Sequence, residues 1–250
     1  GGSLASGSSQ LYSSAEGVVT TAYIPGVRSG PTDGVSVRAC WDYDDFAAGA
    51  CPNQVVVALT VTAEPISVSI GTNGLISLGA GDLTYIQRFV VKVVDSAGVA
   101  MPNVSISPVL DLTDYYKGGW ALGGTGWVWN PTARCTNEDS NRNGVMDAGE
   151  DINGSGILEP RKADVSIAFV SGTQTDSSGQ LQLQIEYPRN VGSWDVYKIT
   201  VSATGVSGTE GVDTYTDILR VLASDANTTT ATPAFVLSPY GQVGSCTSPD

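Results

Sequence analysis

The run Phe89-Val-Val-Lys-Val-Val-Asp95 decides the fold class of this chain. It is almost entirely apolar and β-branched, and side chains of that kind pack well on the pleated surface of a sheet. Ala97-Gly98, just beyond it, is a turn signal. We therefore expect a central β-strand over residues 85–95.

Similar short runs recur along the chain, and no helical periodicity persists anywhere. This pattern predicts an all-β protein. Besides residues 85–95, the expected strands are residues 17–23, 34–40, 54–62, 66–71, 103–110, 165–170, 180–187, 197–203 and 213–222. Residues 1–16 are rich in Gly, Ser and Ala and predict a linker.

An internal repeat divides the chain into units. The parallel segments are residues 14–25 and 176–188, residues 35–39 and 199–203, and residues 57–63 and 217–223. From this repeat we predict that residues 1–63 form a partial unit of three strands. It is equivalent to the second half of a complete unit over residues 64–223. Residues 111–164 interrupt the complete unit as an insertion, and residues 224–250 form a Thr-rich tail.

The insertion contains a calcium-loop pattern, D-x-[DN]-x-[DN]-G-x5-E, matched without a gap from Asp139 to Glu150. A hard cation needs six to eight oxygens, a glycine at the sharp turn and a bidentate carboxylate at the end. The expected ligands of one Ca²⁺ are Asp139, Asn141, Asn143, the carbonyl of Val145, Asp147 and Glu150. A solvated acidic turn cluster is the alternative.

A second, weaker loop follows directly. Its equivalent positions are Asp151, Asn153, Ser155, Gly156, the carbonyl of Ile157 and Glu159. Its twelfth position is Lys162, which cannot bind a cation, so a second Ca²⁺ would need Glu159 or Asp164 to complete its shell. A turn without an ion is the alternative here too.

The first loop resembles an EF-hand loop over its twelve residues alone. Neither flank predicts a helix, because Pro131 precedes the loop and Asn153-Gly154-Ser155-Gly156 follows it. The segment is more similar to the helix-poor calcium loops of dockerins and thrombospondin type 3 repeats.

Composition excludes several function classes. The 250 residues carry a net charge of −13, which argues against nucleic acid or an anionic membrane as a partner. The absence of histidine removes the commonest general base and the usual zinc ligand. No stretch is long and apolar enough for a membrane span. The chain begins Gly-Gly-Ser without Met, and we expect a processed or truncated fragment of a secreted protein.

The four cysteines form no C-x-x-C pair, and their even number predicts two disulfides in an oxidising compartment. A bond between Cys40 and Cys51 would close a local loop. Cys135 and Cys246 would then join the tail to the calcium-like loop. Free buried thiols are the alternative.

Three motifs in the complete unit carry a family resemblance. They are Val-Lys-Val-Val-Asp-Ser-Ala-Gly-Val-Ala-Met-Pro-Asn-Val (91–104), Thr-Asp-Ser-Ser-Gly-Gln-Leu (175–181) and Ile-Thr-Val-Ser-Ala (199–203). They resemble the bacterial immunoglobulin-like domains of the invasin and intimin type, over about half of residues 64–223. The resemblance implies an immunoglobulin-like β-sandwich of about seven strands. The long calcium-loop insertion departs from an ordinary domain of this kind.

The leading functional hypothesis is an extracellular, calcium-binding structural module of a bacterial surface, adhesin or filament protein. Its partners would be neighbouring immunoglobulin-like domains or identical subunits, joined by strand exchange through the apolar run at residues 232–238; a truncated array is the alternative. The alternative function is a carbohydrate- or ligand-binding module with Trp120, Trp127 and Trp129 as a stacking platform. We do not expect an enzyme, because no carboxylate pair is marked by a motif.

Overall fold

The computed structural model describes residues 2–5, 11–24, 33–47, 49–60, 66–95, 97–204 and 211–250. The chain forms two compact units. Unit 1 comprises Gly1–Ile66 and Thr204–Glu210, and unit 2 comprises Ser67–Ala203 and Gly211–Asp250. The predicted boundary between residues 63 and 64, and the end of the predicted strand 54–62, lie outside the described residues.

Unit 1 holds two antiparallel strand pairs among its described residues. They are β1 (Ser3–Leu4) with β2 (Tyr23–Ile24), and β3 (Val35–Trp41) with β4 (Asn53–Leu59). The strands predicted at residues 34–40 and 54–62 correspond to β3 and β4. The strand predicted at residues 17–23 is wrong except for its last residue, and part of the expected linker pairs instead as β1. A strand persists only where a neighbouring strand takes up its hydrogen bonds.

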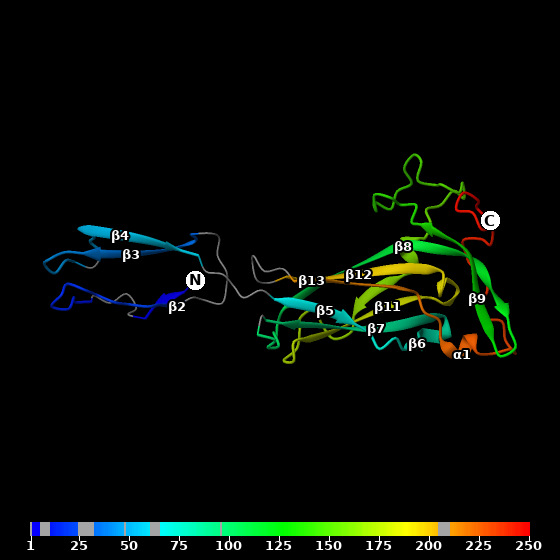
Figure 1. Cartoon of the computed structure of the whole chain (residues 1–250), viewed down its shortest axis with the longest axis horizontal. Helices are drawn as coiled ribbons and strands as arrows, with labels where there is room; N and C mark the ends of the chain where they lie inside the picture. The colour runs from blue at the N-terminus through cyan, green and yellow to red at the C-terminus, as the bar shows by residue number, and fades with distance from the viewer. Residues whose placement is uncertain are drawn as a thin grey trace. The chain divides into compact units, whose positions relative to one another are not determined.

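Unit 2 is a β-sandwich of two sheets (Figure 1), which confirms the all-β prediction. One sheet has the order β10 (Ser166–Phe169), β11 (Gln180–Pro188), β7 (Thr84–Val94) and β5 (Ser67–Gly71), with β6 (Ile76–Leu78) also paired to β7. The other has the order β13 (Val212–Ile218), β12 (Asp195–Thr204), β8 (Ser105–Leu122) and β9 (Trp127–Thr136). The short helices are η1 (Ala80–Asp82), η2 (Lys162–Asp164), η3 (Arg189–Val191) and α1 (Ala223–Ala226).

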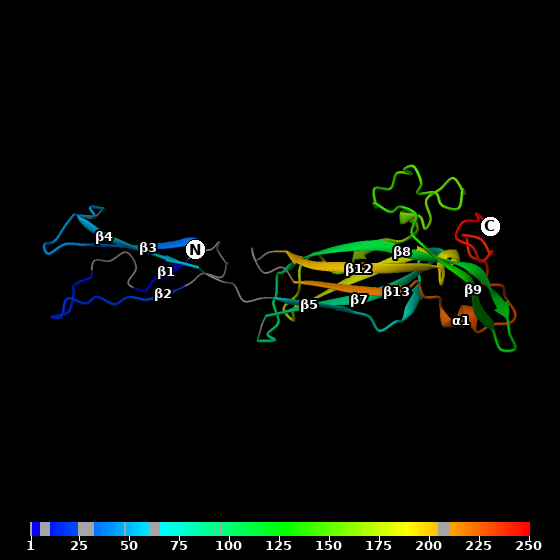
Figure 2. The same cartoon turned by 45° about the horizontal axis from the view of Figure 1, so that its top comes forward.

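The core of unit 2 lies between the two sheets, which Figure 2 shows as layers. Along β7 every second residue is buried, so that Phe89, Val91 and Val93 face inward, as strand geometry requires. Strands β11 and β12 alternate in the same way and bring Ile185 and Tyr197, among others, to the same interior. The run that predicted a central strand is therefore confirmed as one, since β7 is paired on both sides.

The expectation that residues 111–164 interrupt the strands is wrong for its first half. Strand β8 continues to Leu122, and β9 pairs back along it. Gly118 and Pro131 look like strand breakers in the sequence, but a register shift after Lys117 accommodates both. Gly118 has a φ of 128°, and a Cβ there would lie 2.7 Å from the carbonyl oxygen of Asn130. The irregular insertion is thus confined to residues 137–165.

The C-terminal segment, residues 224–250, packs against the second half of β8 in the β8–β9 hairpin. Phe235 is fully buried and packs on Trp120, with ring centroids 5.0 Å apart, and Tyr240 packs on Tyr115 at 4.8 Å. The main chain follows β8 as well, because the Trp120 amide donates to Val236 and the Ser238 amide donates to Gly118. The run at residues 232–238, for which we predicted strand exchange between subunits, therefore packs on β8 of its own unit.

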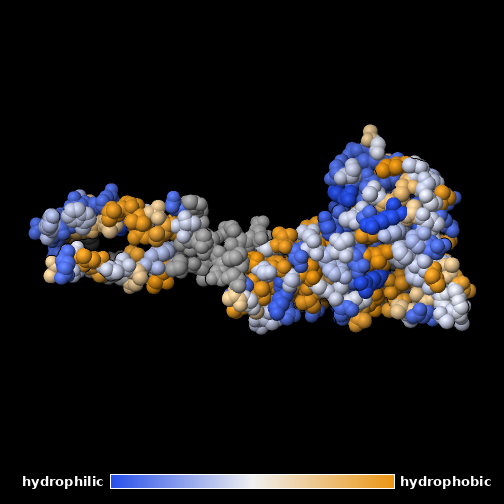
Figure 3. Space-filling model, viewed as in Figure 1, coloured by the Kyte–Doolittle hydropathy of each residue, from blue (hydrophilic) through white to orange (hydrophobic). Residues whose placement is uncertain are grey.

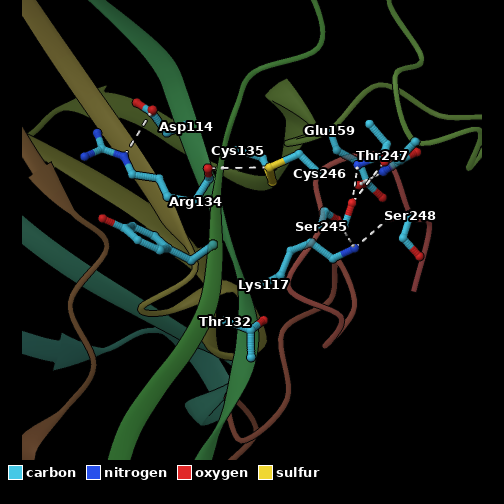
Figure 4. The surroundings of a disulfide bond; sticks show 12 residues. Asp114, Lys117, Thr132, Arg134, Cys135, Glu159, Ser245, Cys246, Thr247 and Ser248 are labelled. Atoms are coloured by element: carbon cyan, nitrogen blue, oxygen red, sulfur yellow. Dashed lines mark hydrogen bonds and ion pairs between the residues drawn. A yellow bond between two sulfur atoms is a disulfide. The ribbon is translucent and has the colours of Figure 1, made fainter.

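Two disulfides confirm the predicted pairs, Cys40 with Cys51 and Cys135 with Cys246. The second joins β9 to the C-terminal segment (Figure 4). Beside it, the fully buried Lys117 donates from Nζ to the main-chain oxygens of Ser245, Ser248 and Asp250, at 3.2, 2.6 and 2.8 Å. No helix in the described parts of the chain is long and apolar enough to cross a membrane.

One buried carboxylate in unit 2 is unsatisfied. Asp195, at the start of β12, is fully buried, and neither of its carboxylate oxygens has a hydrogen-bond partner among the described residues. Burial raises the pKa of Asp195 well above its ordinary value; the neighbouring Tyr240 hydroxyl lowers it in part, and the acidic neighbour Asp164 raises it further. A carboxylate whose pKa is raised in the folded state favours folding at low pH, and that contribution is lost as the pH rises above about 4.

We therefore predict that Asp195→Asn stabilises unit 2 at neutral pH. The expected rise in Tm at pH 7 is about 2–4 °C, equivalent to about 1 kcal/mol, and the rise should shrink toward pH 4. Thermal unfolding followed by circular dichroism between pH 4 and 8 measures it. The control is Asp82→Asn, at an exposed position of positive φ that Asn tolerates, and it should leave the pH dependence unchanged. A Tm difference independent of pH would contradict the prediction.

Candidate metal centre

The two predicted calcium loops lie in the irregular segment 137–165, between β9 and β10. Its start is fixed to β8, because the Asn137 amide donates to Thr113 at 3.0 Å and the Asn137 side chain donates to the carbonyl of Leu112 at 2.6 Å. The segment is drawn in green above β8 in Figures 1 and 2. In Figure 3 this region of the surface is mostly hydrophilic.

Loop 1, residues 139–150, folds around the carboxylate of Asp139. Its two oxygens accept the amides of Asn143 at 3.0 Å and Gly144 at 2.9 Å. Gly144 has a φ of 75°, a conformation that favours glycine at the sixth position. Asn141 and Asn143 form the next two turns by accepting the amides of Asn143 and Val145.

The remaining polar side chains of loop 1 converge on Asp147. Its Oδ2 accepts the side-chain amides of Asn141 at 2.8 Å and of Asn143 at 2.9 Å. The third, fifth and ninth positions of the pattern are thus brought together.

Glu150 closes loop 1 from the twelfth position. One carboxylate oxygen accepts the amide of Ser140 at 2.9 Å and its hydroxyl at 2.8 Å, and the other accepts the amide of Asp147 at 3.0 Å. The amide of Asp147, first, and then the Ser140 hydroxyl hold the pKa of Glu150 below its usual value. The group is therefore an anion that spans the two sides of the loop.

Loop 2, residues 151–162, repeats this geometry twelve residues later. Asp151 accepts the amides of Ser155 and Gly156, both at 3.0 Å, and Gly156 has a φ of 82°. The Asn153 side chain donates to Glu159 at 2.8 Å, as Asn141 and Asn143 donate to Asp147. The weaker second pattern therefore adopts the same backbone as the first.

Glu138 is the residue that sequence reasoning missed. Its two oxygens accept the amides of Asn153 at 3.3 Å and Glu159 at 3.1 Å, and its own amide donates to the carbonyl of Glu159 at 2.9 Å. It thus holds the ninth residue of loop 2 as Glu150 holds the ninth residue of loop 1. The signal was present in the sequence, because each glutamate directly precedes the first aspartate of a loop, twelve residues apart.

Loop 2 gathers negative charge in a buried place. Glu138 and Glu159 are 2% and 4% exposed. Burial raises the pKa of each; Asp151 raises the pKa of Glu138 further, and Glu138 raises that of Glu159. Such neighbouring carboxylates are costly without a compensating positive charge. Asp164, the other predicted closing residue, is held instead by Arg161, with nitrogen–oxygen distances of 3.0 and 3.1 Å.

The donor set decides which ion would fit. Within the described residues, no three Asp, Glu, His or Cys side chains are grouped so that they could hold a metal ion. Each loop reaches six oxygens only when its amide or hydroxyl groups and the carbonyl of Val145 or Ile157 are included. Carboxylate, amide, hydroxyl and carbonyl oxygens without thiolate or imidazole are the ligands that Ca²⁺ prefers.

The three tryptophans predicted as a stacking platform are partly buried in unit 2. Trp129 packs between Tyr116 and Trp194, with centroids 5.1 and 6.5 Å away, and Trp120 packs on Phe235. Their indole N–H groups are used in two cases, by Trp120 toward Ser193 and by Trp127 toward the carbonyl of Ala231. These contacts are those of an aromatic cluster beneath the C-terminal segment.

Comparison with known proteins adds no family to these observations. No family model matches the sequence, and no curated protein matches it.

Proposed function

We propose that this chain is a calcium-stabilised, immunoglobulin-like module of an extracellular bacterial surface, adhesin or filament protein. The observation that carries the proposal is the repeated arrangement of loops 1 and 2. In each loop an aspartate accepts the amides of the fifth and sixth residues, and a glutamate bridges to the ninth. This geometry supports the proposal of one Ca²⁺ at loop 1 and a second at loop 2.

The strand order of unit 2 supports the immunoglobulin-like part of the proposal. The order β5-β7-β11-β10 has the sequence relationships of strands A-B-E-D in an immunoglobulin domain. The order β13-β12-β8-β9 likewise has those of G-F-C-C′. The acidic loops then lie in the connection between the equivalents of strands C′ and D.

Two features support a structural role for calcium in an oxidising compartment. The disulfides are stable outside the cytosol, where free calcium is also abundant. The loops form almost no apolar core, so the backbone entropy lost on ordering them, about 1–2 kcal/mol per residue, needs another source of stabilisation. A divalent cation would also relieve the repulsion among Glu138, Glu159 and Asp151.

We predict that calcium raises the Tm of unit 2. At a free Ca²⁺ concentration about 100 times Kd, binding stabilises the folded state by about 2.7 kcal/mol, which corresponds to about 5–10 °C. Thermal unfolding in Ca²⁺ and in chelator measures the shift, and limited proteolysis should cut residues 137–165 only in chelator. Identical melting and cleavage in both conditions would refute the structural role.

We predict further that two closing glutamates hold two ions. Isothermal titration should give two Ca²⁺ per chain, and Glu150→Gln and Glu138→Gln should each reduce the number to one, because each removes the bridging carboxylate of one loop. The matched control is Asp164→Asn, which should still bind two ions since Asp164 belongs to the Arg161 ion pair. A Glu138→Gln variant that binds both ions with unchanged Kd would exclude Glu138 as the closing residue.

A further inference from the structure

A cavity of about 590 Å³ lies between loop 1 and the side of the sandwich. Its walls are mostly apolar and come from the first half of β8, from β10 and from the segment that precedes β10, with Val109, Leu158 and Ile167 among them. That volume is in the range of ligand pockets and accommodates a large side chain. It belongs wholly to unit 2.

The rim of this cavity carries both basic and acidic residues. Three of the twelve lysines and arginines of the chain line it, namely Arg142, Arg161 and Lys162, against the two acidic residues Asp111 and Asp139. Arg142 is paired with Asp111 at 2.8 Å, and Arg161 is paired with Asp164 at 3.0 Å. Lys162 is exposed and has no ion pair among the described residues. In a chain of net charge −13, the positive charge of Lys162 at this rim suits an acidic partner.

A segment of unit 1 has the complementary chemistry. The loop closed by the Cys40–Cys51 disulfide contains Trp41-Asp42-Tyr43-Asp44-Asp45-Phe46, with three acidic residues and no basic one. Tyr43 is 95% exposed, more than any other large apolar side chain in the described parts of the chain. Trp41 stacks edge-on against it with ring centroids 6.0 Å apart.

An exposed aromatic pair on a closed loop is a suitable anchor for an interface. Aromatic side chains that fill a pocket provide most of the energy at protein interfaces, and a loop fixed in advance loses little entropy on binding. The acidic residues beside Tyr43 would meet Lys162 at the rim of the cavity.

We propose that the disulfide-closed acidic loop of one copy docks into the cavity beside loop 1 of a second copy. The two surfaces are different, so the contact is heterologous and propagates into a chain of molecules or a closed ring. This contact would be one way for the proposed filament or surface protein to assemble. It rests on the proposed function, because loop 1 forms one wall of the cavity.

Sedimentation velocity of the full chain in Ca²⁺, over a range of concentrations, tests the docking. Wild type should associate as the concentration rises. Tyr43→Ala and Lys162→Ala should each weaken association by about 10-fold or more. The matched controls, Tyr12→Ala and Lys92→Ala, change another exposed tyrosine of unit 1 and an exposed lysine of β7, and should associate like wild type.

Mixing the two weakened variants distinguishes a second copy from other occupants. Tyr43→Ala retains an intact cavity and Lys162→Ala retains an intact loop, so the mixture should form dimers and nothing larger. A wild-type chain that stays monomeric at all concentrations overturns the proposal. That result is expected if the loop docks within its own chain, or if the cavity binds only a small anion. Unchanged association of Tyr43→Ala overturns it as well.

The calcium titrations keep this test separate from the proposed function. A wild-type chain that binds two Ca²⁺ but does not associate would contradict the docking proposal and leave the proposed function standing. A wild-type chain that associates but binds no Ca²⁺ would contradict the proposed function and leave the docking proposal standing.

Discussion

The buried ammonium group of Lys117 ties the last residues of the chain to the β8–β9 hairpin, and much of unit 2 depends on this contact. A fully buried charge is tolerated only when its donors are satisfied, and three main-chain oxygens of the C-terminal segment do this. The same segment covers the aromatic cluster around Trp194 and is bonded to β9 through Cys135. Cys135 lies two residues before Asn137, where the acidic loops begin, so these loops start from a fixed base.

Two kinds of stabilisation meet in this unit. Between the sheets, burial of apolar side chains such as Phe89 and Ile185 accounts for the order. In the loops, order comes from carboxylates that accept main-chain amides, and it gathers negative charge as it does so. Apolar burial between the sheets needs no bound ion, whereas the carboxylate-rich loops lack enough positive charge to balance theirs. This contrast is the physical reason for assigning the cation to the loops and a scaffold role to the sandwich.

Local patterns predicted those parts of the molecule whose causes are local. Strand β7 follows from its β-branched run, and the turns of loops 1 and 2 follow from their Asp, Asn and Gly spacing. Strand β9 and the second half of β8 could not be predicted, because Gly118 and Pro131 are strand breakers unless distant packing accommodates a bulge. The burial of Asp195 depends on elements far apart in the sequence, and for that reason no pattern marked it.

The role of Glu138 was hidden for a related reason. A pattern search looks for the closing carboxylate after its loop, and loop 2 has Lys162 there. The structure takes the carboxylate from before loop 1 instead. Loop 2 therefore depends on a residue that precedes loop 1, while Glu150 ends loop 1 and directly precedes loop 2. Loop 1 thus contains its own closing glutamate and loop 2 does not, so a fragment that began after Glu138 would keep the closing residue of loop 1 and lose that of loop 2.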